Sequence, residues 1–131
     1  MRRLGYVLVC FSLVLAAHAT QSAPAPQVTG IYSNLRLIPS EGDVVGTEVF
    51  ILSSGTAYFV LVQCAEGVLG PPELLPATVE YPTVKFTVPE HTASMCLAGE
   101  FEGTLTSRGL NGAVRGSDWP GFLPRKKSFW Q

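Results

Sequence analysis

Few residues in this 131-residue chain have the types and spacing that catalysis needs. His91 lies in a polar turn beside Glu90, and it is the histidine that remains if the first residues are removed on export. A hydrolytic triad also needs a poised serine and a distant acid, and the chain has no Gly-x-Ser-x-Gly elbow. We therefore expect His91 to be an exposed turn residue, and we predict no catalytic residues. A hydrolase of unknown type stays open as an alternative.

The acidic residues offer two further kinds of chemistry, a metal site and an acid–base pair. Glu90 and His91 have no recognised metal-ligand spacing with the distant Glu100 or Glu102. Glu100 and Glu102 are two residues apart, so on one strand face they would resemble the paired carboxylates of glycosidases. Solvated strand charges explain them better. We predict neither a metal site nor a cofactor.

Two cysteines, Cys64 and Cys96, remain outside the first nineteen residues. Two cysteines in an exported chain usually pair. The closed loop would hold about 33 residues, for which the chain-entropy estimate is about 3 to 4 kcal/mol of stabilisation. Two buried free thiols are the alternative, whereas a nucleophilic cysteine would need a positioned base.

Residues 1–19 have the organisation of a secretory signal peptide. Arg2 and Arg3 precede the apolar run Leu4–Ala17, and Ala17-His18-Ala19 is a small-x-small cleavage site. The apolar run is shorter than the roughly 20 residues that span a bilayer, so we expect export and no stable membrane span. The predicted location is periplasmic or secreted.

The mature chain is expected to hold one domain, residues 28–131, after a flexible spacer rich in proline and alanine, residues 20–27. Two of the nine basic residues fall in the signal peptide, which leaves seven against ten acidic residues and a net charge of −3. Basic residues do not cluster as nucleic-acid binding requires, so no nucleic-acid partner is predicted. Acidic residues predominate up to Glu102 and basic residues after it, so we expect attraction between neighbouring strands of the two parts.

Eight extended segments separated by turn residues predict an all-β domain. No window shows helical periodicity, and short strands at roughly even spacing favour a sandwich or a barrel. One face of most strands is apolar and the other polar, which is typical of antiparallel sheets. The expected strands are residues 30–38, 44–53, 56–63, 74–80, 83–88, 95–106, 110–116 and 122–130.

The alternation identifies the side chains that face the interior. In a barrel of about eight strands the interior is just wide enough for side chains, so bulky aromatic residues there indicate a filled interior. The predicted interior residues are Val49, Ile51, Tyr58, Val60, Val62, Val84, Phe86, Phe101 and Leu105.

The hairpin from Glu48 to Cys64 departs from the alternation because both of its faces are apolar. Its outward side chains are expected to be Phe50, Leu52, Phe59 and Leu61. The loop around Val68 and Leu69, a second copy of the chain or an unknown protein partner could cover them. Exposed apolar patches of a few hundred Å² mark interaction sites when no chain segment covers them.

The C-terminal segment combines Arg125-Lys126-Lys127 with Phe129 and Trp130. Such a segment could contact an anionic surface, at about 1 kcal/mol per basic residue before salt screening. Protection of an edge strand by lysine explains it as well, and we prefer that interpretation. Charged outward residues on the fifth and sixth strands argue against an outer-membrane barrel.

Three stretches match the motifs of one group of barrels. Gly30-Ile31-Tyr32 looks like an opening Gly-x-Trp, and Phe101–Leu105 followed by Leu110-Asn111-Gly112 looks like repeated Phe-x-Gly-x-Leu…Leu-x-Gly hairpins. Arg125 matches a late basic residue that packs over the opening aromatic ring. The chain thereby resembles small exported bacterial barrels of the lipocalin-like or calycin-like kind. The resemblance implies a meander of about eight strands that forms a small barrel with one open end.

One residue departs from that resemblance. By alternation Tyr32 lies on the face opposite Leu35 and Leu37. We therefore expect Tyr32 to point away from the barrel, whereas the lipocalin tryptophan points into it.

The sequence as a whole favours an exported, non-enzymatic β-barrel that binds or scaffolds through an apolar surface. Because the interior is expected to be filled, a protein partner or a homodimer is preferred. A carrier of a small apolar molecule inside the barrel is the first alternative, and the hydrolase is the second.

Overall fold

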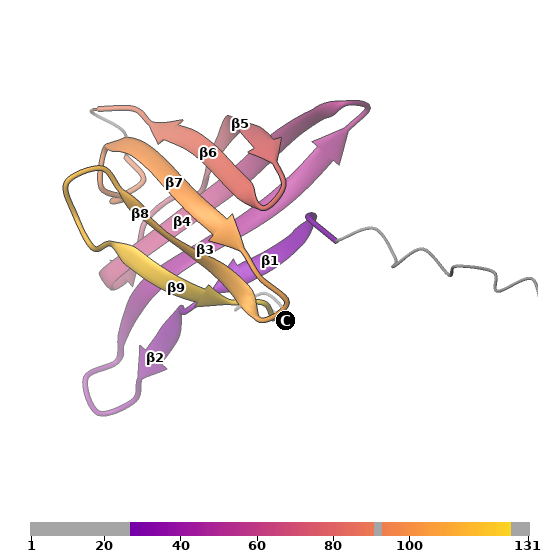
Figure 1. Cartoon of the computed structure of the whole chain (residues 1–131). Coiled ribbons are helices and arrows are strands. Elements are labelled where there is room, and N and C mark those ends of the chain that lie inside the picture. Colours follow the sequence, from indigo (N-terminus) through magenta and orange to yellow (C-terminus); the bar gives the residue numbers. More distant parts are fainter. Residues whose placement is uncertain (1–26, 91–92, 127–131) are drawn as a thin grey trace, which may run out of the picture.

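The computed structural model describes residues 27–90 and 93–126. The predicted signal peptide, most of the spacer, His91 and residues 127–131 lie outside the described residues. Within them, one antiparallel sheet curls into a nearly closed barrel (Figure 1). Its strands are β1 (Gly30–Ser33), β2 (Arg36–Ile38), β3 (Asp43–Ser54), β4 (Ala57–Leu69), β5 (Glu73–Glu80), β6 (Thr83–Val88), β7 (Gly99–Leu105), β8 (Gly109–Val114) and β9 (Pro120–Pro124).

The strand order is β1-β3-β4-β5-β6-β7-β8-β9, and β2 pairs with β3 beside β1. From β3 onward each strand pairs with the next in the chain, and every pair is antiparallel. The described residues contain no helix. The predicted all-β antiparallel meander of about eight strands is confirmed.

The first predicted strand is divided into β1 and β2. Between them the backbone N–H of Asn34 donates to the Thr47 carbonyl, and the Asn34 side-chain oxygen accepts from the Thr47 N–H at 2.7 Å. The chains come so close that a Cβ on Gly46, whose φ is +114°, would lie 2.6 Å from the Asn34 carbonyl oxygen. An amide side chain here replaces one backbone partner of the ladder, so β1 and β2 together act as one interrupted strand.

The β3–β4 hairpin is longer than the sequence predicts. Its register runs from Ser54↔Ala57, at the turn that Gly55 forms with φ +60°, to Val44↔Gly67. Glu66–Leu69 is predicted to be a loop, but these residues belong to β4. That prediction is wrong because the start of β3 is available as a pairing partner, which outweighs the poor strand propensity of glycine.

The barrel interior is filled by side chains. Eight of the nine predicted interior residues are buried, and Tyr58 packs half-buried against them. The rings of Phe86 and Phe101, paired across β6 and β7, stack with centroids 4.5 Å apart. Such a pair contributes about 0.5–1.5 kcal/mol beyond the area it buries. Further buried side chains that complete the core are Tyr32, Cys64, Leu75, Val88, Leu110, Val114 and Leu123.

Tyr32 and Arg125 join the first and last strands. Tyr32 pairs with inward-facing Val49, so its ring points into the barrel and is fully buried. The expectation that it points outward is wrong. Alternation does place it opposite Leu37, but Leu37 is the residue that faces solvent, at 51% exposure. The Arg125 guanidinium lies 4.8 Å from the centre of the Tyr32 ring, a cation–π distance.

Hydrogen bonds complete this closure. Arg125 donates to the carbonyl oxygens of Thr29, at 3.0 Å, and Gln27, and also to the Tyr32 hydroxyl. The Tyr32 hydroxyl donates to the Val28 carbonyl at 2.7 Å, and the Lys126 N–H donates to the Ile31 carbonyl at 3.0 Å. We call this part of the barrel the closed end.

The predicted disulfide joins Cys64 and Cys96, with Cα atoms 5.2 Å apart. Cys64 faces the interior from β4, and Cys96 lies in the connection between β6 and β7. A strand was expected from residue 95, but β7 begins at Gly99, so the connection is longer. It packs against the β4–β5 connection, where a Cβ on Gly70 would lie 2.4 Å from the Ser94 carbonyl oxygen. We call this opposite end of the barrel the mouth.

Removing the disulfide is expected to lower the free energy of unfolding by about 3 to 4 kcal/mol, because the unfolded chain loses a closed loop. The comparison is between wild type and Cys64→Ser/Cys96→Ser by urea unfolding. Reducing the wild type should give the same loss. A change below about 1 kcal/mol in both would contradict a stabilising role.

Gly30→Ala is expected to destabilise the barrel by about 3 kcal/mol, because strain at positive φ adds to overpacking. Gly30 has φ +139°, and a Cβ there would lie 2.7 Å from an Arg125 guanidinium nitrogen. Gly42→Ala is the matched control, since Gly42 has φ +76° and nothing within 4 Å of the added Cβ. It should cost about 1 kcal/mol. Equal losses in thermal or urea unfolding would show that the guanidinium contact is unimportant.

Candidate functional site

The predicted outward side chains of the hairpin lie in two rows that cross neighbouring strands. The register aligns Ile31, Phe50, Leu61 and Leu74 in one row, and Leu52, Phe59 and Pro76 in the next. We call these seven residues the apolar face. Phe50, Leu52, Phe59 and Leu61 are half-buried, and Leu74 is 59% exposed.

Three members of this face, Ile31, Leu74 and Pro76, were not predicted from the sequence. Each lies on a strand that flanks the central hairpin. Their membership depends on the pairing register of β1 with β3 and of β4 with β5, which alternation within one strand does not determine. The Pro71-Pro72 pair in the connection before β5 was the one local signal that the chain turns there.

Toward the mouth, the outer surface beside the apolar face is covered. Ser33, Glu48 and Ala65 point outward by register but are only 0 to 7% exposed, and Leu35, between β1 and β2, is 3% exposed. The chain after β4 folds back at this point, because the Gly70 N–H donates to the Cys64 carbonyl and the Gln63 amide donates to the Gly70 carbonyl. Val68 itself is 65% exposed, so its side chain does not supply the cover that the sequence suggested.

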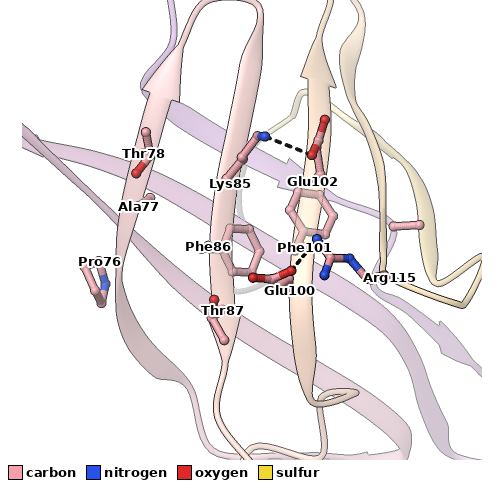
Figure 2. A pocket seen from close by; sticks show the side chains of 11 residues that line it. Pro76, Ala77, Thr78, Lys85, Phe86, Thr87, Glu100, Phe101, Glu102 and Arg115 are labelled. Carbon is pink, nitrogen blue, oxygen red and sulfur yellow. Dashed lines mark ion pairs between the residues drawn. The ribbon is translucent and has the colours of Figure 1, made fainter.

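A groove of about 550 Å³ continues the outer surface across β5 to β8 (Figure 2). Lys85 Nζ lies 3.0 Å from Glu102, and the Arg115 guanidinium lies 2.6 Å from Glu100. All four side chains are more than half exposed. The residues along the groove are Pro76, Ala77, Thr78, Lys85, Phe86, Thr87, Glu100, Phe101, Glu102, Ala113 and Arg115.

The groove brings Glu100 and Glu102 together on one strand face, as the sequence analysis expects. Glu102 is ion-paired with Lys85 on β6 and Glu100 with Arg115, directly after β8, and neither carboxylate is buried. Exposed pairs of this kind contribute about 0–1 kcal/mol to stability. Their geometry is that of solvated strand charges, and both ion pairs are accessible from solvent.

One carboxylate faces inward. Glu73 pairs with interior residue Val62, and its Oε2 atom is buried without a hydrogen-bond partner. The β5–β6 ladder stops at Ala77↔Phe86, where Pro76 has no N–H to extend it. The first half of β5 is thus paired with β4 alone, and Glu73 lies at the resulting split in the sheet. The strand predicted from the sequence begins one residue later, so this carboxylate was not predicted to face inward.

The part of the chain that the structure describes holds no group of three or more His, Cys, Asp or Glu side chains that could hold a metal ion. His91, the one histidine considered for catalysis, lies outside it. No helix among the same residues is long and apolar enough to cross a membrane.

Tyr32 has the clearest electrostatic perturbation. Burial raises its pKa above the ordinary tyrosine value, the nearby Arg125 charge opposes that rise, and Tyr81 adds to it. The folded barrel therefore binds the hydroxyl proton more tightly than the unfolded chain does.

Comparison of the chain with known proteins gives no further information about this surface. No protein-family model matches the chain, and no curated protein or solved structure is detectably similar to it. The functional inference therefore rests on the geometry of the described residues.

Alkaline solution is expected to destabilise the barrel. Because the folded pKa of Tyr32 is raised, its contribution is fully present below the ordinary tyrosine value of about 10 and is lost as the pH rises through the folded value. Urea unfolding across this range should show the loss in wild type. Tyr32→Phe should be less stable at neutral pH by about 1–2 kcal/mol but should depend less on pH. Tyr58→Phe is the control, and an identical flattening there would contradict the assignment.

Proposed function

We propose that the protein is an exported, non-enzymatic β-barrel that binds a protein partner, or a second copy of itself, through its outer surface. The observation that supports this most is the apolar face, which places seven apolar residues in register over four strands. Three strand spacings make it about 14 Å wide. Interfaces combine such an apolar centre with a polar rim, and the charged groove adjoins the face at Pro76.

A lipocalin-like assignment and export belong to the same proposal. The packing of Arg125 over Tyr32, with Gly30 beside the guanidinium, supports the resemblance to lipocalin-like barrels. The disulfide is compatible with an oxidising compartment, such as the periplasm or the cell exterior.

The filled interior favours a partner over a carried ligand. Large side chains from β1, β3, β4, β6, β7, β8 and β9 occupy it, and little of them is exposed. The carrier alternative has one supporting observation, the inward Glu73 oxygen at the β5–β6 split. That oxygen would require the ligand to bring a hydrogen-bond donor or a positive charge, and native mass spectrometry of the purified protein would reveal a ligand-sized addition.

The hydrolase alternative has less support among the described residues. Its best candidate pair, Glu100 and Glu102, is ion-paired on an open strand face. General acid–base catalysis by two carboxyl groups requires different environments that separate their pKa values. Both carboxylates here are exposed and both are paired with a cation.

A negative charge on the apolar face is expected to weaken association at least about tenfold. Phe59→Glu tests the centre of the face, and Leu74→Glu tests an exposed position where folding is not at risk. Thr104→Glu is the matched control, because Thr104 is exposed on β7 and lies outside both the apolar face and the groove. Sedimentation over a concentration series would show self-association in wild type and Thr104→Glu, but not in the other two.

A monomer in every case would exclude the self-association form and leave the partner form. A photo-crosslinking amino acid at position 74 in the living cell then tests the partner form. An adduct is expected there and not with the same amino acid at Thr104, an exposed position on β7. Absence of adducts at position 74 would contradict the proposed function.

A further inference from the structure

The two ends of the barrel carry opposite charge. At the closed end, Arg108, Arg125 and Lys126 are opposed among the described residues by Glu80 alone. At the mouth, Arg36 and Arg115 face a larger acidic set. These acidic residues are Glu41, Asp43, Glu66, Glu73, Glu90, Glu100 and Asp118. The basic and acidic residues are therefore separated along the barrel axis, with the basic residues at the closed end and most acidic residues at the mouth.

Exposed aromatic side chains accompany the basic residues at the closed end. Tyr81, in the β5–β6 turn, is 54% exposed, and Phe122, on β9, is 44% exposed. The Pro82 carbonyl accepts from the Leu105 N–H, so the β5–β6 turn contacts the end of β7 next to Arg108. A Cβ on Gly109 would lie 3.0 Å from the Phe122 ring, which places that ring beside the turn between β7 and β8, where Arg108 lies.

Backbone hydrogen bonds also hold the basic residues Arg108, Arg125 and Lys126 at the closed end. The Arg125 N–H donates to the Arg108 carbonyl at 2.9 Å, and Lys126 is bonded through its N–H to Ile31. Because these bonds use the backbone, the exposed side chains of Arg108 and Lys126 are not needed for closure.

We propose that the closed end docks on the surface of an anionic lipid bilayer. Basic residues near such a surface each contribute about 1 kcal/mol, a roughly fivefold change in binding. Exposed Tyr and Phe side chains can bury their apolar rings at the headgroup level of a bilayer. The acidic mouth would be repelled and would face away, which leaves the apolar face open to its partner. The inference concerns a second surface and goes beyond the proposed function.

The test is co-sedimentation of the exported protein with phosphatidylcholine vesicles prepared with or without phosphatidylglycerol. Two exposed basic residues predict a roughly 30-fold preference for the anionic vesicles at low salt. Arg108→Glu/Lys126→Glu should abolish this preference, and Tyr81→Ala/Phe122→Ala should reduce binding. Arg36→Glu/Arg115→Glu, which changes the net charge equally at the mouth, is the matched control and should bind like wild type.

Three results would overturn the inference. The first is that wild type binds neutral vesicles as well as anionic ones. The second is that Arg36→Glu/Arg115→Glu loses as much vesicle binding as Arg108→Glu/Lys126→Glu. The third is that wild type binds dextran sulfate, a soluble polyanion, as tightly as it binds anionic vesicles. A fourth result would also contradict it. If wild type self-associates without binding vesicles, and Arg108→Glu/Lys126→Glu removes that self-association, then the closed end binds the acidic mouth of a second copy of the chain. Leu74→Glu should leave vesicle binding unchanged, so failure here is distinguishable from failure of the proposed function.

Discussion

The register between β3 and β4 is the constraint on which the other features depend. It aligns Val49 with Val62 and Ile51 with Val60 on the inner side, and it puts Cys64 on that side too. A shift of one residue would reverse every side chain of one strand and would place Phe50 or Phe59 in the core. The filled interior, the disulfide and the apolar face are therefore consequences of one pairing.

Because side chains fill the barrel interior, surfaces that could bind other molecules lie on the outside of the barrel. Stacked Phe86 and Phe101 and the buried Tyr32 occupy the space that a carried ligand would need. Closure by Arg125 completes the core at one end, and the disulfide-linked connection holds the other. What remains available for recognition is the outer face of the sheet and the two ends.

These outer surfaces differ in chemistry because different strands supply them. β3 and β4 are buried on one face and half-buried on the other, so their outer residues are apolar. β6, β7 and the turn after β8 carry exposed ion pairs that contribute little to stability. Charge adds a third distinction, because Arg108, Arg125 and Lys126 lie at the closed end and most acidic residues lie toward the mouth. A single small barrel thus presents outer surfaces of distinct chemistry: an apolar face, a charged groove and two ends of opposite charge.

The sequence by itself determined the fold class and most of the interior positions, and it favoured a disulfide between Cys64 and Cys96 over two free thiols. Alternation and turn residues are local, and two cysteines in an exported chain usually pair. The tertiary structure decided which face of β1 is inside, because alternation divides Tyr32 from Leu37 without saying which is enclosed. It also decided that Leu74 and Pro76 join the apolar face and that basic residues meet at one end. Those features depend on pairing between strands and on closure of the sheet, and residues distant in the chain set both.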